Sequence, residues 1–316
     1  MTAAAARFAA QWAAVAPPDK VGLAVSGGPD SLALLLLFHE VAPRNFAVAT
    51  VDHGLRPEAA AEAAMVAALC AARGIPHDTL TLALAKGSAV QERARIARYG
   101  ALGQWCADNH LAALVTAHHA DDQAETIIMR LNRGAGLRGL AGMRPRATVP
   151  ETPDLPLLRP LLGWRRADLT AVVESAGLTA AHDPSNRDAA FERVRIRAAL
   201  TSSDAFAPNG FSASATHLAE ADHALEWAVD QLWSDVKDAD EGFTWNPAPS
   251  LPPVIALRVL ERILAASGSG VPRGPDLARW LATLRSGGVA TLGGIKADAR
   301  RAPWRFTRAP RRNNKA

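Results

Sequence analysis

The first 130 residues alternate between strand and helix signals, and this alternation constrains the fold more than any other feature. Apolar runs typical of strands and patterns typical of helices follow one another in the order 21–25, 31–41, 45–51, 58–73, 77–84, 90–108, 111–116 and 121–131. Strands separated by helices of this length predict a parallel sheet with helices on both faces. We therefore expect an α/β fold with a doubly wound, mostly parallel sheet, whose ligands bind beyond the carboxyl ends of the strands.

The rest of the chain has a different pattern. Residues 133–160 are rich in Gly, Pro and Arg and predict a long loop. Further helices are expected at 164–177, 191–200 and 217–236. The polar, small-residue stretch 201–214 suggests a linker, so we expect a domain over 1–210 and a smaller helical or α+β domain over 211–316.

Composition excludes several classes of protein. With 49% hydrophobic and 21% charged residues, the chain has a folding composition. The longest apolar run, Leu32–Phe38, is far shorter than the roughly 20 residues of a membrane-spanning helix. The N-terminal segment lacks a basic start and ends at Pro17 and Pro18, which favours a short amphipathic helix over a signal peptide. Two cysteines, Cys70 and Cys106, indicate neither a disulfide framework nor a thiolate metal site. We expect a cytoplasmic protein without a membrane partner.

The basic residues are clustered, although the net charge is only +4. From Arg300 to the end there are seven basic residues and no acidic one. Between Arg130 and Arg166 there are eight arginines against Glu151 and Asp154. Such clusters can hold a polyanion and make its binding sensitive to salt. For the tail alone, a solvated segment that binds nothing is the alternative.

The strongest local signal is GLAVSGGPDSLALLLL, in which an apolar strand runs into two glycines and then into a helix. Two glycines let the backbone turn tightly and approach a ligand closely, and proline suits the first position of a helix. The free N–H groups at the helix start then face an anion. The candidate phosphate-binding residues are Ser26, Gly27, Gly28, Pro29, Asp30 and Ser31. Asp30 could hold Mg²⁺ or cap the helix. This segment is neither a Walker loop nor a dinucleotide fingerprint, because the lysine and the glycine spacing of those motifs are missing.

Polar residues also follow two other strands. Asp52 and His53 follow the second strand and should lie at the same edge of the sheet, where the histidine could contact nucleotide. The segment AHHADDQAET follows the strand 111–116. Its Asp122 and Glu125 are three residues apart and share one helix face, so they could bind Mg²⁺, attract an ammonium group or accept a proton from an amine. A transition-metal site and a capped helix with a solvated acidic face are the alternatives.

Two later helices carry arginines at helical spacing. Arg95 and Arg98 share one face, for which an ordinary salt-bridging role is the alternative. Arg193 and Arg197 share a face of the helix after DPSNRD and could hold phosphate or a nucleic-acid backbone.

These segments together resemble one family. The pyrophosphate loop SGGPDS is similar to that of the N-type ATP pyrophosphatases, and the full set resembles tRNA(Ile)-lysidine synthetase. The matching pieces are SGGPDS, VDHGLRPEAAAEA, ARIARY, TAHHADDQAETIIMRLNRGAGLRGLAGM, LLRPLLGWRRADL and DPSNRDAAFERVRIRAAL. They cover about residues 20 to 200, and the C-terminal part is a weaker match. The sequence departs from the family pattern at Ala59 or Ala60 and at Ala135, where serine is common.

The resemblance implies a reaction and a set of roles. ATP and Mg²⁺ would serve to adenylate O2 of the wobble cytidine in an isoleucine tRNA with a CAU anticodon, and free L-lysine would then displace AMP. The catalytic residues would be Asp30, Asp122, Glu125, Arg95 and Arg197, with Asp122 and Glu125 binding and activating lysine and Asp30 at the magnesium edge. Pyrophosphate would lie on Ser26–Ser31, with Asp52 and His53 near the nucleotide. The tRNA contacts would include Arg133, Arg138, Arg144, Arg193, Arg305, Arg308 and Arg311.

Other functions remain as alternatives at this point. A tRNA-thiolating enzyme of the same superfamily would need reactive cysteines, and Cys70 and Cys106 lie in the middle of predicted helices. An amidating enzyme of the superfamily would lack the basic clusters. A module that binds ATP and tRNA without catalysis is the alternative outside enzymes. The oligomeric state stays open, with a homodimer as one alternative.

Overall fold

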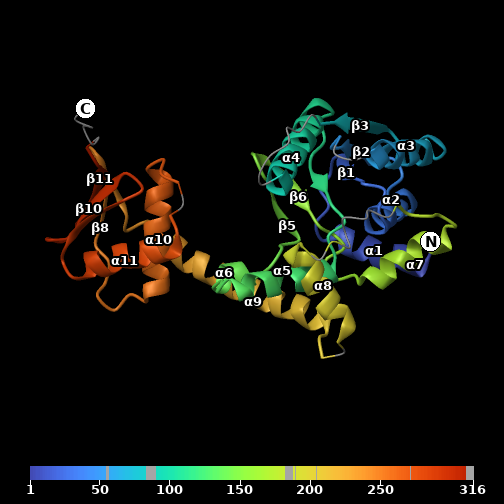
Figure 1. Cartoon of the computed structure of the whole chain (residues 1–316). Helices are drawn as coiled ribbons and strands as arrows, with labels where there is room; N and C mark the ends of the chain where they lie inside the picture. The colour runs from blue at the N-terminus through green and yellow to red at the C-terminus, as the bar shows by residue number, and fades with distance from the viewer. Residues whose placement is uncertain are drawn as a thin grey trace. The chain divides into compact units, whose positions relative to one another are not determined.

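The chain forms two compact units, Met1–Ala219 and Glu220–Ala316 (Figure 1). The computed structural model describes residues 1–54, 57–82, 90–181, 188, 190–203, 205–270 and 272–310. Helix α9 (Pro208–Trp233) contains both the expected boundary at 210 and the division between the two units. None of the helices in the described ranges has both the length and the apolar character needed to cross a bilayer.

The first unit is built on a six-stranded sheet. Its strands are β1 (Val21–Ala24), β2 (Phe46–Asp52), β3 (His77–Thr81), β4 (Leu114–Val115), β5 (Arg146–Val149) and β6 (Thr152–Leu158). Their order is β3-β2-β1-β4-β6-β5, and only the pair formed by β5 and β6 is antiparallel. This arrangement confirms the expected α/β class with a mostly parallel sheet.

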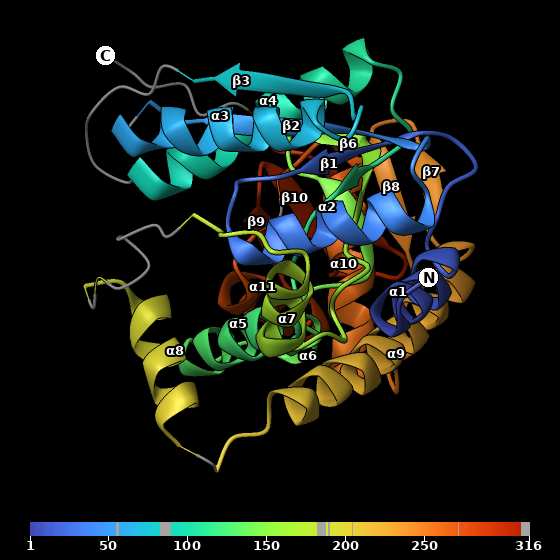
Figure 2. The same cartoon turned by 90° about the vertical axis from the view of Figure 1, so that its right-hand side faces the viewer.

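Helices cover both faces of this sheet (Figure 2). The helices of this unit are α1 (Ala3–Ala13), α2 (Pro29–Val41), α3 (Pro57–Ala71), α4 (Val90–Asp108), α5 (Ala120–Asn132), α6 (Leu137–Leu140), α7 (Arg166–Ser175) and α8 (Glu192–Ser202), together with the start of α9. Alternate residues of a strand point to opposite faces. Leu23 and Val48 therefore pack with α1, α2, α3 and α7, whereas Ala47 and Leu114 pack with α4.

The strand order places a switch point between β1 and β4. From β1 the chain moves through α2 to β2 and on to β3, and it returns through α4 to β4 on the other side of β1. Ligands of open α/β sheets bind at such a point, outside the carboxyl ends of the strands. The glycine loop follows β1 and the segment AHHADD follows β4, so both lie at this switch point.

The long loop expected over 133–160 is wrong, because the segment contains α6 and the hairpin of β5 and β6. Prolines at 153 and 156 lie within β6 and weigh against a strand in any interpretation of the sequence. The hairpin accommodates an irregular register between Thr148 and Val149. The end of β6 is nevertheless buried, since β6 pairs with β4 on its other side and its Leu157 and Leu158 are in the core.

The second unit combines helices with an antiparallel sheet. Its strands are β7 (Lys237–Ala239), β8 (Gly242–Trp245), β9 (Val289–Leu292), β10 (Ile295–Asp298) and β11 (Trp304–Arg308), in the order β7-β8-β11-β10-β9. The helices α10 (Pro253–Ala266) and α11 (Gly274–Arg285) pack on this sheet together with the end of α9. Its core includes Trp245, Leu260, Trp280 and Phe306, so the unit has a hydrophobic core of its own.

Candidate functional site

The glycine loop connects β1 directly to the N-terminus of α2. Gly27 has a φ of 85°, which favours glycine, and Gly28 is the N-cap of α2. A Cβ atom on Gly27 would lie 3.2 Å from Met65 Cε, whereas one on Gly28 would meet only Ser26 Oγ at 3.7 Å. Gly28 therefore faces open space. The first N–H groups of a helix have no acceptor within it, so this end of α2 can receive an anion.

Two serines fix the shape of the loop. The hydroxyl of Ser31 donates to the carbonyl of Gly28 at 3.0 Å and accepts from the backbone N–H of Ser26 at 3.1 Å. Ser26 Oγ lies 3.2 Å from Ser31 Oγ. Ser31 is buried and Ser26 is exposed, so Ser31 braces the loop while Ser26 can turn toward a ligand. Proline at 29 occupies the first turn of α2, as expected from the sequence.

His119 lies at the centre of the acidic cluster between β1 and β4. Its side chain is fully buried, and its Nε2 atom is 3.4 Å from Oδ2 of Asp30 and 3.4 Å from Oδ2 of Asp122. Its Nδ1 atom accepts the backbone N–H of Asp121 at 3.2 Å and caps α5. In the neutral ring the proton therefore lies on Nε2, between the carboxylates of Asp30 and Asp122.

The surrounding carboxylates change the titration of His119. Burial alone would lower the pKa of His119, but the three neighbouring aspartates outweigh burial and raise it from 6.5 to about 9. The second proton would bind at Nδ1, which lies 3.5 Å from Oδ2 of Asp121, so the charged ring would donate to this carboxylate and no longer accept the backbone N–H of Asp121. Burial would raise the pKa of Asp122, but the His119 charge and Arg193 lower it overall. The cluster thus holds Asp122 ionised beside an imidazolium at neutral pH.

The adjacent histidine has the opposite character. His118 is paired with the Thr116 hydroxyl through Nδ1 at 2.8 Å. Burial lowers the pKa of His118 to about 3, so its ring is neutral at physiological pH. The two histidines next to each other in the sequence therefore carry different charges. In the described part of the chain no group of three or more His, Cys, Asp or Glu side chains has the geometry to hold a metal ion, which gives the transition-metal alternative no support.

Glu125 is buried and ion-paired with two arginines of α8. Its Oε1 atom accepts from Arg197 Nε at 2.6 Å, and its Oε2 atom accepts from Arg193 Nε at 2.8 Å and from Arg197 Nη2 at 3.2 Å. Arg193 Nη2 also lies 3.8 Å from Oδ1 of Asp122. Arg193 and Arg197 thus share a helix face, as their spacing predicts. Because both oxygens of Glu125 are engaged, Asp30 and Asp122 are the more open carboxylates of the cluster.

Arg95 and Arg98 lie on α4 beside Tyr99. Their guanidinium carbons are 5.0 Å and 5.2 Å from the centre of the Tyr99 ring, within the range of cation–π interactions. The same two arginines line a cavity of about 250 Å³ with Ala94 and His53. The structure therefore brings His53 and Arg95 to one cavity, although they are far apart in the sequence. Asp52 accepts the backbone N–H of Gly54 at 2.9 Å and shapes the turn after β2.

Sequence reasoning missed three residues of this region. The sequence points to His119 only as part of AHHADDQAET and to Tyr99 only as part of ARIARY, and neither pattern gives the single residue a role. The sequence points to Arg159 only as part of a basic stretch and of the piece LLRPLLGWRRADL, yet it is the first residue after β6 and is 8% exposed. Arg159 directly follows β6, which runs parallel to β4, and this position at the carboxyl edge of the sheet is the signal for a site residue. The signal can be used only if β6 is recognised as a strand.

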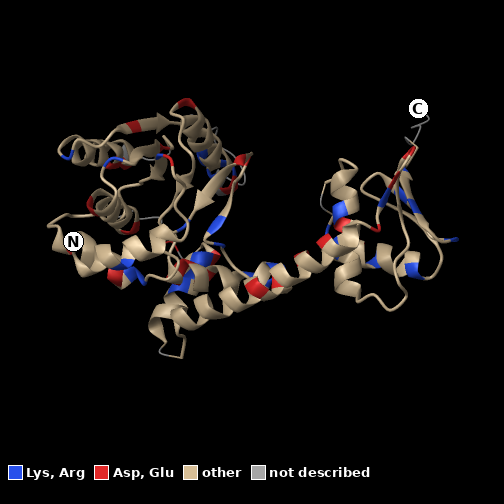
Figure 3. Ribbon diagram, turned by 180° about the vertical axis from the view of Figure 1, so that it is seen from behind, with Lys and Arg blue, Asp and Glu red and all other residues tan. Residues whose placement is uncertain are grey.

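The arginines expected to contact tRNA are dispersed. Arg133 forms an ion pair with Glu192, and Arg193 is engaged with Glu125. Figure 3 shows basic and acidic residues side by side in this part of the first unit. Arg138 in α6 is exposed, and Arg144 after α6 is half-buried.

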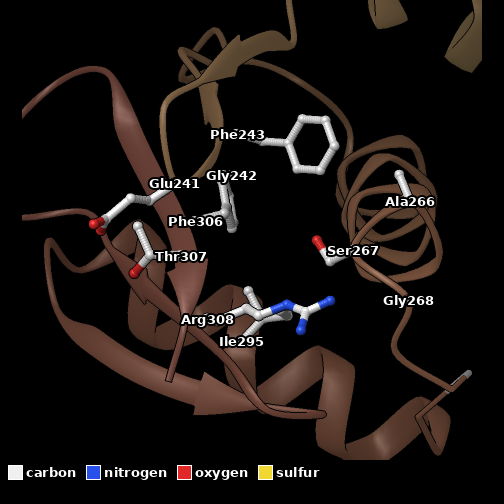
Figure 4. Close-up of a pocket in the computed structure, with 10 residues that line it drawn as sticks. All are labelled: Glu241, Gly242, Phe243, Ala266, Ser267, Gly268, Ile295, Phe306, Thr307 and Arg308. Atoms are coloured by element: carbon white, nitrogen blue, oxygen red, sulfur yellow. The ribbon is translucent and has the colours of Figure 1, made fainter. Parts of the chain in front are cut away.

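The remaining arginines of this prediction belong to the second unit or lie outside the described residues. Arg305 and Arg308 are exposed on β11, three residues apart, so they point to opposite faces of its sheet. Arg308 lines a cavity of about 740 Å³ together with Phe243, Ser267 and Phe306, and its guanidinium points into this space (Figure 4). Arg311 is outside the described ranges.

A strand that runs into a glycine turn and then a helix, at the switch point of a parallel sheet, defines an ATP-binding domain of the PP-loop class. Residues 1–203 match the family model of the PP-loop domain. In the solved structures, the chain is similar to the U34-tRNA thiolase NcsA from Methanococcus maripaludis, with a TM-score of 0.55 and 16% identity over 68% of this chain and 76% of that chain. At this identity the similarity supports the fold alone.

Curated relatives identify the particular family within this class. The chain is 65% identical to a tRNA(Ile)-lysidine synthase of Novosphingobium aromaticivorans, over 98% of this chain and 95% of the relative. It is 39% identical to a tRNA(Ile)-lysidine synthase of Zymomonas mobilis, over 93% of this chain and 89% of the relative. The chain belongs to the tRNA(Ile)-lysidine synthase family. The expected family is thereby confirmed, including the C-terminal unit that gave the weaker match.

Proposed function

We propose that this ligase adenylates O2 of the wobble cytidine in the CAU anticodon of an isoleucine tRNA and then joins the ε-amine of free L-lysine to C2. In the first step the cytidine oxygen attacks the α-phosphorus of ATP, and pyrophosphate leaves. In the second step the amine nitrogen forms a bond to C2 and the C2–O bond breaks, releasing AMP. The observation that carries this proposal is that the glycine loop after β1 and the start of α5 after β4 meet at the switch point, where Asp30 of the loop and Asp122 both approach Nε2 of His119.

The glycine loop supports the first step. Its open side at Gly28 and the N-terminus of α2 can hold the leaving pyrophosphate, and Ser26 can donate a hydroxyl. Arg95 and His53 line the cavity beside this edge, where the nucleotide or the AMP-linked intermediate would extend. Cationic groups in these positions stabilise the charge that develops on the phosphates.

Asp30 fits a magnesium ion that arrives with ATP. Mg²⁺ is usually held by one or two carboxylates together with substrate phosphates. Asp30 Oδ1 is buried and has no hydrogen-bond partner among the described residues, so it offers an oxygen ligand beside the loop. When bound, the ion would offset charge on the phosphates, and we assign Asp30 as its protein ligand.

The acidic cluster supports the second step. The amine of lysine has a reference pKa near 10.4 and must lose a proton before it can attack. Asp122 can attract the ammonium group and then receive its proton. Glu125 is saturated by Arg193 and Arg197, so we propose that it positions these arginines. Direct binding of lysine by Glu125 stays a prediction, and it would require Arg193 or Arg197 to release an oxygen.

The cysteines give the thiolase alternative no support. Cys70 and Cys106 are both buried. Burial raises the pKa of Cys70 to about 11 and that of Cys106 to about 12, which keeps both sulfurs protonated and unreactive. Replacing both with serine should therefore leave turnover intact.

The decisive experiment supplies ATP, radiolabelled lysine and a transcribed tRNA to the purified full chain. We expect label in isoleucine tRNA with a CAU anticodon and none in methionine tRNA, together with release of pyrophosphate. Asp30→Ala should abolish lysine-dependent pyrophosphate release, whereas Asp19→Ala, at an exposed loop position of the same unit, should retain it. Near-normal turnover of the Asp30 variant would show that the assignment of the loop is wrong.

A further inference from the structure

Arg159 lies next to the acidic cluster at the carboxyl edge of the sheet. The backbone N–H of Thr116 donates to the carbonyl of Leu158 at 3.0 Å, so the residues after β4 and after β6 leave the sheet side by side. After β4 the chain continues to His118, His119 and Asp122, and after β6 the first residue is Arg159. The charge of Asp122 raises the pKa of His118, whereas that of Arg159 lowers it.

Arg159 is a buried cation with no carboxylate partner among the described residues. Its side chain is 8% exposed, Nη1 donates to the carbonyl of Arg144 at 2.9 Å, and Nε has no acceptor within the described ranges. No ion pair links Arg159 to any carboxylate of the described chain. Burial lowers the pKa of Arg159, and the neighbouring cations Arg95 and Arg130 lower it further. Burying an unpaired charge is costly, so a site of this kind is completed by an anion.

A second unpartnered polar group lies near Arg159. The hydroxyl of Tyr99 is fully buried and has no hydrogen-bond partner among the described residues. Tyr99 packs in the same core cluster as Leu157, which lies two residues before Arg159, and its ring is approached by Arg95 and Arg98. Arg159 and Tyr99 thus present donors that no protein acceptor satisfies within the described residues, as expected for residues that bind a small anion.

The strand order separates this anion site from the phosphate loop. The order β2-β1-β4-β6 places the loop after β1, the acidic cluster after β4 and Arg159 after β6. ATP phosphates on the loop and a group on Arg159 would therefore lie on opposite sides of Asp122. A phosphate of the tRNA backbone remains on a bulky, hydrated polymer, whereas Arg159 is 8% exposed. A carboxylate on a free amino acid is small enough to reach such a position.

We propose that Arg159 binds the α-carboxylate of the lysine co-substrate, with the Tyr99 hydroxyl as a second donor. This inference rests on the proposed function. The lysine molecule then extends from Arg159 at its carboxylate to Asp122 at its ε-ammonium group. A guanidinium can bind a carboxylate through two parallel hydrogen bonds, which fixes both its position and its orientation. The site would then select an amino acid and reject a plain diamine.

The test compares L-lysine with cadaverine, which has the same amine and chain but no carboxylate. The wild-type chain should prefer lysine in kcat/KM by at least about tenfold, because cadaverine leaves the buried guanidinium unpaired. Arg159→Met should raise the KM for lysine at least about tenfold and remove the preference for lysine over cadaverine. In the same variant, kcat/KM for cadaverine and the KM for tRNA should stay within about twofold of the wild-type values. Arg279→Met, which alters an exposed arginine of the second unit, is the matched control and should change none of these values.

Three results would overturn the proposal. One is a wild-type enzyme that uses cadaverine as well as lysine. Another is an equal loss with both amines in Arg159→Met, which indicates a structural role. The third is an increase in the KM for tRNA alone, which indicates a backbone phosphate. If Arg159→Met does not fold, Tyr99→Phe serves as the second variant, because it removes only one hydroxyl. Labelled lysine should bind more weakly to Tyr99→Phe than to the wild type at equilibrium. Unchanged binding would contradict the proposed site. A folded wild-type chain with no lysine-dependent activity would instead contradict the proposed function.

Discussion

At the scale of single residues, His119 controls the charge of the site. Asp30 and Asp122 approach its Nε2 atom from two different helices, and without the imidazole they would face each other as like charges. Its neighbour His118 is neutral, so the positive charge between these carboxylates comes from His119. The importance of His119 therefore comes from its burial between carboxylates, which is a property of the folded chain.

Replacing His119 should change how stability depends on pH. A pKa that rises from 6.5 to about 9 on folding adds stability below pH 6.5, and this stability is lost as the pH rises through 9. The shift corresponds to about 3 kcal/mol at most. We expect the free energy of unfolding to fall between pH 6.5 and 9 in the wild type, and His119→Gln to lack this fall. Denaturant titrations at several pH values measure it, and parallel pH curves for the two proteins would refute the assignment.

At the scale of secondary-structure elements, the two glycines of the loop between β1 and α2 have different roles. Gly27 is required by the backbone conformation, whereas Gly28 leaves space for a ligand. Gly27→Ala forces a φ of 85° on a residue with a Cβ atom and should cost about 1–2 kcal/mol of stability. Gly28→Ala has space for its Cβ atom and should fold normally. If Gly28 faces the phosphates, its alanine variant should still raise the KM for ATP at least about tenfold. Thermal melts and ATP kinetics separate the two effects, and an unaltered ATP KM in Gly28→Ala would place the phosphates elsewhere.

The contact between α4 and β1 offers a second matched pair. A Cβ atom on Gly22 in β1 would lie 2.4 Å from Cζ3 of Trp105, so Gly22→Ala should destabilise the first unit by at least about 2 kcal/mol. Gly100 lies in α4, like Trp105, but a Cβ atom added to it would have no neighbouring atom within 4 Å. Gly100→Ala should therefore stabilise by about 0.5–1 kcal/mol through helix propensity. Urea unfolding measures both, and a loss of stability in both variants would contradict this packing.

The elements that carry strong local signals could be predicted from the sequence. The helix expected at 90–108 is observed as α4 with these bounds, and the glycine turn before α2 was recognised from its composition. The hairpin of β5 and β6 could not be predicted, because prolines lie within β6. Without β6, the sequence does not show that Arg159 lies at the carboxyl edge of the sheet. The pairing of Glu125 with Arg193 and Arg197 was not predictable either, since it joins residues about 70 positions apart through the packing of α8 on α5.

At the scale of the whole molecule, the basic residues of the second unit should contribute to tRNA affinity. Arg305 and Arg308 are exposed and have no ion pair among the described residues, unlike Arg279, which is paired with Asp276. Arg305→Ala and Arg308→Ala should each weaken tRNA binding. Each variant should also reduce the magnitude of the slope of log affinity against log salt concentration by about 1 for each phosphate that it no longer neutralises. Arg279→Ala is the control. A salt slope unaffected by either variant would exclude these two residues from the tRNA interface.

The pairing of β1 with β4 has a consequence for the time course of folding. Gly22 pairs with Leu114, so the switch point forms only when segments about ninety residues apart have met. Local helices form in microseconds, whereas parallel pairing over such a separation is intrinsically slow. A refolding chain should therefore regain its helical circular dichroism before it regains nucleotide binding, and an incompletely folded chain would not consume ATP.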